Sequence, residues 1–226
     1  MTRSTRSVST TGRRPARALV PVLAPALAGL LLLVLPAAPA TAQELAVRFD
    51  PEATDVTFDV DATGHDVHGS FAFREGEIRF DPRTGAASGD LVVDATLGES
   101  GNGSRDKTMH KKVLESARFP LFVFHADEVV GELAPEGEST LELRGRLEIH
   151  GAEHPVSIPA TVVRTGERFR SSAQFAVPYE DWGMHHPGFL FLRVAPEVQV
   201  TVAAEGRLEP ADEMASATGG AHGGGR

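Results

Sequence analysis

Apolar and polar residues alternate with a period of two along most of the chain between Leu45 and Leu208. In the segment DVTFDV, Val56, Phe58 and Val60 fall on one face, and acidic or hydroxyl side chains fall on the other. Such alternation is typical of β-strands with one buried face. The pattern recurs in about eight or nine segments joined mostly by short turns. These runs predict an antiparallel sandwich or a closed barrel.

Two of the predicted strands place a glycine on the inward face, at Gly69 and Gly145. Glycine permits the sharp strand curvature that a barrel needs and a flat sheet does not. The two glycines therefore favour, within an all-β fold, an antiparallel barrel of about eight strands over a sandwich. A barrel of this size either fills with side chains or encloses one small ligand. The strands are expected at residues 55–60, 67–73, 76–81, 90–97, 121–130, 140–151, 155–163, 168–177 and 197–206.

One segment, SGNGSRDKTMHKKVLESARFP at residues 100–120, breaks the β pattern. It opens on a Gly-rich turn and continues with helical character. Asn102 or Ser104 can accept hydrogen bonds from the free N–H groups of a first helical turn, which makes either one a suitable N-cap. The sequence predicts a helix over residues 105 to about 117, with the pair Val113–Leu114 turned inward. A helix inserted into a barrel belongs over or beside its mouth.

The predicted helix places Arg105 and Asp106 next to each other in its first turn. Arg105 and the backbone N–H groups of the preceding turn suit a phosphate or carboxylate head group. Alternatively, Arg105 and Asp106 form a buried pair that fixes the helix to the barrel rim. Both interpretations stay open for Arg105, and the structural one is favoured for Asp106.

Asp106 and His110 are four residues apart, which is a spacing that lets two side chains share one metal ion on a helix. Ser104, His110 and Asp106 also invite comparison with a hydrolase triad. No G-x-S-x-G turn or separate oxyanion segment accompanies them, so we expect no catalysis. A third metal ligand would have to come from His65, His68 or His125.

The N-terminal residues have the features of a secretory signal peptide. Arginines precede an apolar run at residues 18–34, and Ala40 and Ala42 supply an A-x-A cleavage site. The run contains prolines and is shorter than the ~20 apolar residues of a spanning helix, which argues against a retained anchor. We expect residues 1–42 to be removed after export to the periplasm or beyond the cell. The Arg13–Arg14 pair leaves Sec and twin-arginine export open.

The chain is acidic, with 22 basic and 31 acidic residues. Without the arginines of residues 1–42, 17 basic residues remain and the net charge is −14. This balance argues against nucleic acids and anionic membrane surfaces as partners. Cysteine is absent, which excludes thiol nucleophiles, thiolate metal sites and disulfides. We expect one domain at residues 43–208 and a disordered Gly-rich tail at residues 209–226.

Several short motifs occur in a specific order between Leu45 and Leu208: HDVHGSF, GEIRFDP, SRDKTMH, RFPLFVF, LRGRLEIHGAEHPVSIP and DWGM. Their order and spacing resemble the YceI-like family of exported polyisoprenoid-binding proteins. The resemblance implies an extended, lipocalin-like antiparallel barrel with a helical segment between strands. It also implies that a long isoprenoid or similar lipid lies in the lumen.

We therefore expect a lipid carrier or reservoir that needs no cofactor and no metal. The chain has 12 Phe but only one Tyr and one Trp, so its apolar face carries few polar groups. Inward apolar side chains are expected to hold the lipid, and Arg105 is the candidate for its head group. The predicted ligand-binding residues are Phe58, Val60, Phe71, Phe73, Arg105, His110, Phe122, Phe124, Leu143, Leu147, Ile158 and Phe175.

Two other functions stay open at this point. One is a metal- or redox-linked periplasmic protein that uses His65, His110 and neighbouring histidines. The other is a barrel filled with phenylalanine that serves only as a docking module. We expect no nucleic-acid partner and no stable membrane insertion, and a homodimer stays open.

Overall fold

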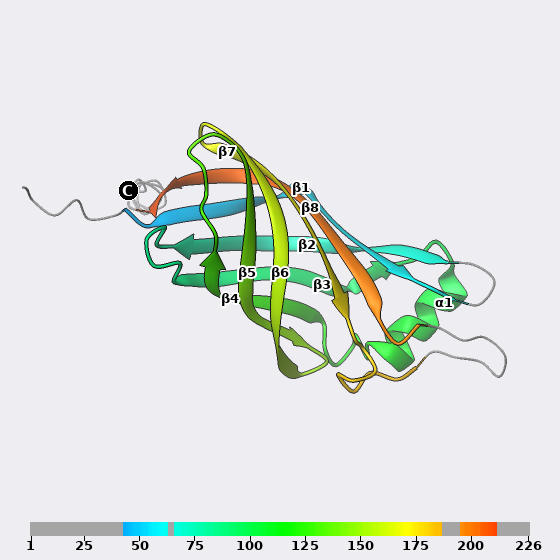
Figure 1. Cartoon of the computed structure of the whole chain (residues 1–226). Coiled ribbons are helices and arrows are strands. Elements are labelled where there is room, and N and C mark those ends of the chain that lie inside the picture. The colour runs from blue at the N-terminus through cyan, green and yellow to red at the C-terminus, as the bar shows by residue number, and fades with distance from the viewer. Residues whose placement is uncertain (1–42, 63–65, 187–194, 212–226) are drawn as a thin grey trace, which may run out of the picture. The chain divides into compact units, whose positions relative to one another are not determined.

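The computed structural model describes residues 43–62, 66–186 and 195–211. In this part of the chain, eight strands close in sequence order into one antiparallel barrel (Figure 1). Each strand pairs with the next, and β8 pairs back with β1, so the sheet has no free edge. The predicted all-β antiparallel barrel is thereby confirmed. The strands are β1 (Leu45–Val60), β2 (Val67–Phe80), β3 (Ala87–Glu99), β4 (Leu121–Val130), β5 (Gly137–Ile149), β6 (Ala152–Thr165), β7 (Arg168–Val177) and β8 (Val198–Pro210).

Bulges explain why the barrel has eight strands where the pattern suggested eight or nine. The segments 67–73 and 76–80 belong to one strand, β2, whose register against β3 shifts between Phe73 and Glu75. A bulge adds one residue to a strand and so reverses which side chains face inward beyond it. Phe73 and Ile78 consequently both line the barrel interior although one position is odd and the other even.

The helical segment between β3 and β4 begins earlier than expected and is shorter. It consists of α1 (Gly103–Thr108) and a π-helical turn, η1 (Met109–Val113). Asn102 is the N-cap, because its side-chain oxygen accepts from the backbone N–H groups of Ser104 and Arg105 at 3.1 Å each. The wider helical turn and the choice of cap were not specified by the sequence pattern.

The C-terminal limit of the helix follows from its backbone. The Leu114 N–H donates to the Met109 carbonyl at 2.9 Å, a five-residue separation that defines the π turn. Glu115 then adopts a positive φ of 45°, which stops the helix before the expected limit at Ala117. Val113 and Leu114 are buried, as expected for the inward pair.

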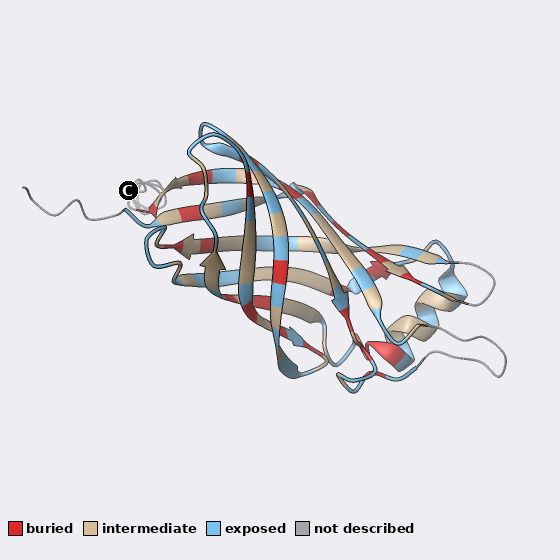
Figure 2. Cartoon of the chain, viewed as in Figure 1, coloured by how far each residue is buried: buried red, intermediate tan, exposed pale blue. Residues whose placement is uncertain are grey.

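The helix lies at one end of the barrel, where the chain also passes from β1 to β2, from β5 to β6 and from β7 to β8 (Figure 1). We call this the helix end. Inward and outward residues alternate along the strands as buried or intermediate and exposed bands (Figure 2). Several large inward side chains, among them Phe71, Phe122 and Phe175, are only partly buried. Incomplete burial of inward phenylalanines indicates that side chains do not fill the lumen.

The two ends of the predicted domain have different outcomes. The expected signal peptide at residues 1–42 lies outside the described residues. At the other end, β8 continues to Pro210 and Ala211 is buried, so ordered structure extends three residues past the predicted boundary. The rest of the predicted tail, residues 212–226, also lies outside the described residues.

Candidate functional site

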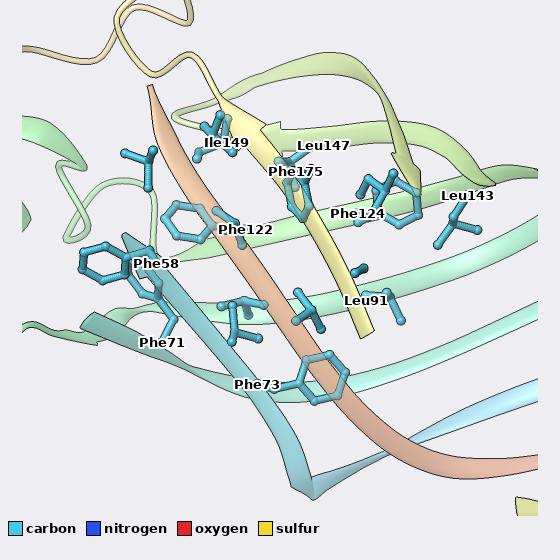
Figure 3. Close-up of a pocket in the computed structure, with 18 of the residues that line it drawn as sticks. Phe58, Phe71, Phe73, Leu91, Phe122, Phe124, Leu143, Leu147, Ile149 and Phe175 are labelled. Atoms are coloured by element: carbon cyan, nitrogen blue, oxygen red, sulfur yellow. The ribbon is translucent and has the colours of Figure 1, made fainter. Parts of the chain in front are cut away.

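The barrel encloses a cavity of about 720 Å³. All eight strands contribute to its wall, and most of the side chains that line it are apolar. Figure 3 shows phenylalanine, leucine and isoleucine side chains projecting from the strands into this space. The volume lies within the ~300–1,000 Å³ that is typical of small-molecule sites. The lumen is therefore large and apolar enough to receive an apolar ligand.

Eleven of the twelve residues predicted to bind a ligand line this one cavity, and His110 does not. The strands bring them together from positions more than one hundred residues apart. Contact with a ligand remains a prediction for each of them. The eleven are Phe58, Val60, Phe71, Phe73, Arg105, Phe122, Phe124, Leu143, Leu147, Ile158 and Phe175.

Aromatic side chains form one group near the helix end of the lumen. The ring centroids of Phe58 and Phe71 are 5.2 Å apart, and those of Phe71 and Phe122 are 5.3 Å apart in an edge-to-face arrangement. These separations are favourable for aromatic pairs. The three rings lie side by side in Figure 3.

A second aromatic group lies farther from the helix. Phe49 contacts Phe169 at 5.3 Å between centroids and Phe73 at 6.2 Å. Phe49 and Phe169 stand near the strand ends opposite the helix. An apolar ligand chain that enters at the helix end would thus meet aromatic surface along the length of the lumen.

Polar lining residues concentrate at the helix end. One continuous segment, the turn before α1 and α1 itself, contributes five of them. The walls formed by the strands are almost entirely apolar, so the cavity has a polar end and an apolar interior. The five polar residues are Ser100, Asn102, Ser104, Arg105 and Thr108.

Ser100 fixes the orientation of Arg105 and Asp106. Arg105 donates from Nε to the Ser100 hydroxyl oxygen at 2.7 Å and from Nη2 to the Ser100 carbonyl at 2.6 Å. Asp106 Oδ1 accepts from the Ser100 backbone N–H at 2.9 Å and from the Ser100 hydroxyl. Arg105 and Asp106 therefore both bond to Ser100. The direct ion pair between them, which was one expectation, is not formed. Arg105 is held in place and still lines the cavity.

His110 connects the helix to its surroundings. Its Nε2 lies 2.8 Å from the Gly98 carbonyl oxygen, which can only accept, so Nε2 carries a proton. Its Nδ1 lies 2.9 Å from the Ser116 hydroxyl, which can donate to it. Both ring nitrogens are used in these contacts. The geometry of a hydrolase triad with Ser104 and Asp106 is accordingly not formed.

The histidines considered as metal ligands have separate partners. His68 bonds to Asp59 through Nδ1. His125 lies between two carboxylates, with Nδ1 2.6 Å from Asp90 and Nε2 3.7 Å from Glu148. Within the described ranges, no three His, Asp or Glu side chains gather in a way that could hold a metal ion. His65 lies outside the described residues.

Tyr179 and Met184 line the cavity but were not among the predicted site residues. They follow β7 in the segment PYEDWGM, where the strand alternation ends and no longer indicates which side chains face inward. The Met184 N–H donates to the Tyr179 carbonyl at 3.0 Å, so a turn brings both residues to the barrel. The DWGM motif was the one sequence feature that could have pointed to these two cavity residues, because it belongs to the family resemblance.

The pKa of Tyr179 is raised to about 12, mainly because burial disfavours the phenolate and also because Glu180 lies beside it. Tyr179 is the only tyrosine of the chain, so the tyrosinate absorbance reports on it alone. We expect a native midpoint near 12 and a midpoint of about 10 in denaturant. Stability should decline as the pH rises through this window, because the unfolded chain then binds fewer protons.

A native midpoint near 10 would show that Tyr179 is exposed, against the structure. Tyr179→Phe removes the signal and serves as the blank. Glu180→Gln should lower the midpoint only slightly, because burial is the larger cause of the shift.

A family model described as the YceI-like domain matches residues 48–206. The match spans most of the chain and nearly the whole barrel. The chain belongs to the YceI-like family. The family assignment confirms the resemblance of the sequence motifs.

Curated relatives of this YceI-like protein include UPF0312 proteins of Vibrio species. One from Vibrio cholerae is 28% identical over 137 residues, which cover 59% of this chain and 64% of the relative. One from Vibrio vulnificus is 26% identical over 165 residues, or 72% of this chain and 79% of the relative. The chain thus spans somewhat less than two thirds of the length of the Vibrio cholerae relative.

Solved structures share the fold of this YceI-like protein at low sequence identity. BcnA of Burkholderia cenocepacia has a TM-score of 0.60 and 18% identity, covering 70% of this chain and 98% of BcnA. A polyisoprenoid binding domain of Saccharophagus degradans, implicated in plant cell wall breakdown, has a TM-score of 0.58 and 16% identity, covering 73% and 99%. Among the residues the structure describes, no helix is long and apolar enough to span a bilayer.

Proposed function

We propose that this YceI-like protein binds a polyisoprenoid-type or similar long-chain lipid in its lumen and acts as an exported carrier or reservoir. The observation that supports it most is the cavity of about 720 Å³ with apolar walls and polar residues at one end. That distribution matches an amphiphile with one small polar group and a long apolar chain. The family relationship and the polyisoprenoid-binding neighbour agree with it.

Hydrophobic burial is sufficient to hold such a ligand. Each buried methylene group contributes about 0.8 kcal/mol, so a long chain binds tightly with few polar contacts. The apolar chain of the lipid extends from the helix end toward the second aromatic group of Phe49, Phe73 and Phe169. The head group stays at the helix end, where Arg105 lies with its Nε and Nη2 directed to Ser100. Binding and release of this kind require no catalysis and no cofactor.

Location in the envelope follows from the proposed signal peptide. Removal of residues 1–42 would leave a chain that starts at Gln43, two residues before β1 begins at Leu45. The lipid carrier would then work in the periplasm or outside the cell. The absence of cysteine means that the barrel depends on its packing and hydrogen bonds in that compartment.

Native mass spectrometry of protein purified from a heterologous host, followed by organic extraction, tests this function. We expect a bound species whose extracted mass corresponds to a long-chain amphiphile at one lipid per chain. The protein mass itself shows whether the chain starts at Gln43. If no lipid co-purifies and none can be loaded from detergent-solubilised polyprenols, the carrier function is wrong.

A further inference from the structure

The chain contains three lysines, and all of them lie on the helical segment at the helix end: Lys107 on α1, and Lys111 and Lys112 on η1. The other 19 of its 22 basic residues are arginines. Lysine is thus confined to one short element of an acidic protein.

These lysines differ from the arginines in their surroundings. All three are exposed, and none has a carboxylate within 4.0 Å among the described residues. Nine of the twelve described arginines do lie that close to an Asp or Glu, for example Arg48 to Glu77 at 3.1 Å. Charges that are not paired within the protein remain available for an external anion.

The helix has one face toward the lumen and another toward solvent. Arg105, Met109 and Val113 line the cavity at four-residue intervals. Lys107 and Lys111 follow the same spacing on the other side of the helix, and both are exposed. We call Lys107, Lys111 and Lys112 the lysine face. It points away from the barrel at the end where the lumen has its polar residues.

Acidic residues on the helical segment itself do not neutralise the lysine face. Asp106 is bonded to Ser100, and Glu115 lies 3.8 Å from Arg118 and 3.4 Å from His150. Glu99, at the end of β3, is exposed and has no ion pair within the described part of the chain. Glu99 is therefore expected to weaken the binding of an anionic surface here. Asp61, Asp66 and Asp181, which are exposed in the other connections at the helix end, oppose it as well.

An exposed apolar side chain accompanies the lysines. Leu97 is 59% exposed, the largest exposure of any large apolar side chain that the structure describes. It precedes Gly98, whose carbonyl accepts from His110 of the helix, so it lies on the strand to which the helix is attached. Basic and apolar side chains together are the usual composition of surfaces that bind anionic membranes.

We propose that the lysine face and Leu97 dock the helix end of the barrel onto an anionic lipid bilayer. The net charge of −9 argues against membrane binding by the chain as a whole. It therefore restricts binding to one orientation of the barrel on the bilayer. The acidic body is repelled while the lysine face is attracted, so the lumen end with Arg105 faces the bilayer. Docking is peripheral and reversible, and salt weakens it. It does not depend on which ligand the lumen holds.

Flotation with vesicles of phosphatidylcholine, with and without phosphatidylglycerol, tests the proposal. We expect binding only to the anionic vesicles and release by salt. Each lysine near an anionic surface contributes about a fivefold factor, so K107Q/K111Q/K112Q should lower binding roughly a hundredfold. Glu99→Gln should strengthen it. Every variant has the same N-terminus, so the N-terminal residues contribute equally to vesicle binding in each measurement.

A matched variant removes the same charge from the opposite end of the barrel: R164Q/R168Q/R170Q, around the β6–β7 turn. It should bind as the unmodified protein does. Equal losses in both triple variants, or no binding to anionic vesicles, would overturn the proposal. Unchanged thermal unfolding of the lysine variant excludes misfolding as the cause. Lipid extraction from that variant separates the two claims, because an empty lumen would contradict the carrier function and leave vesicle docking standing.

Discussion

Ala173→Phe is expected to lower the affinity of the lumen for lipid more than tenfold while leaving the barrel folded. Ala173 lies in the middle of β7 and lines the cavity, opposite Ala160 of β6 in the sheet register. A phenyl ring at this position occupies space that a ligand chain would need. Displacing two methylene groups removes about 1.6 kcal/mol of burial, or more than tenfold in affinity. Filling a cavity commonly stabilises a protein by roughly 0.5–2 kcal/mol, so the melting temperature should not fall.

The matched control is Ala176→Phe in the same strand. Ala176 is exposed on the outer surface, so the added ring does not enter the lumen. Native mass spectrometry and thermal unfolding are measured for both variants. Lipid retained in Ala173→Phe at the level of the unmodified protein would place the ligand outside the lumen. A folded Ala160→Phe variant provides a second test from the facing strand.

Gly145→Ala is expected to destabilise the barrel by about 1–3 kcal/mol, the usual cost of overpacking. A Cβ at this position would lie 2.1 Å from the His125 carbonyl oxygen and 2.7 Å from the Phe124 ring. The carbonyl belongs to the paired strand β4 and cannot move aside without breaking the ladder. Glycine at this position thus allows β4 and β5 to approach and Phe124 to lie against the wall. The midpoint of urea unfolding measures the loss.

Gly103→Ala is the matched control, since a Cβ there meets nothing within 4 Å. Gly103 is the first residue of α1, and alanine is a better helix former than glycine, so stability should hold or rise slightly. Equal unfolding midpoints for Gly145→Ala and the unmodified protein would contradict the close approach of the strands.

The fold could be predicted because its main signal is local. Alternation within segments such as DVTFDV shows directly that Phe58 faces inward. Inward-facing side chains were harder to predict near the ends of long strands, because a register shift reverses which alternate residues face the lumen. Between Phe49 and Thr54 the pairing of β1 with β8 shifts, so Phe49 and Phe58 both line the lumen from positions of opposite parity. A bulge depends on backbone pairing with another strand, which periodicity does not reveal.

The candidate site also has one part that the sequence predicts and one part that it does not. The inward residues of the strands follow from alternation, and they line one cavity. The helix was harder, because a π turn changes the direction of each side chain. His110 shares a helix with Arg105 but bonds to Gly98 and Ser116, and it does not line the lumen. Tyr179 lies after the last regular position of β7, where no pattern indicates its orientation.

The charge of the surface shows what composition leaves out. A net charge of −9 predicts poor affinity for anionic surfaces. The structure shows that the exposed lysines gather on the helical segment, while nine of the twelve described arginines lie close to an Asp or Glu. Local arrangement, and not the sum of charges, determines which partners a face of the barrel can meet.

A crystal structure of the protein with its co-purified lipid would show whether the ligand lies in the lumen. We expect continuous, elongated density in the lumen that starts beside Arg105 and runs past Phe71 and Phe122 toward Phe49. In Ala173→Phe, crystallised in the same way, this density should be weakened or displaced from the wall formed by β7. A lumen filled by protein side chains, or lipid density only on the outer surface of the barrel, would contradict lipid binding in the lumen.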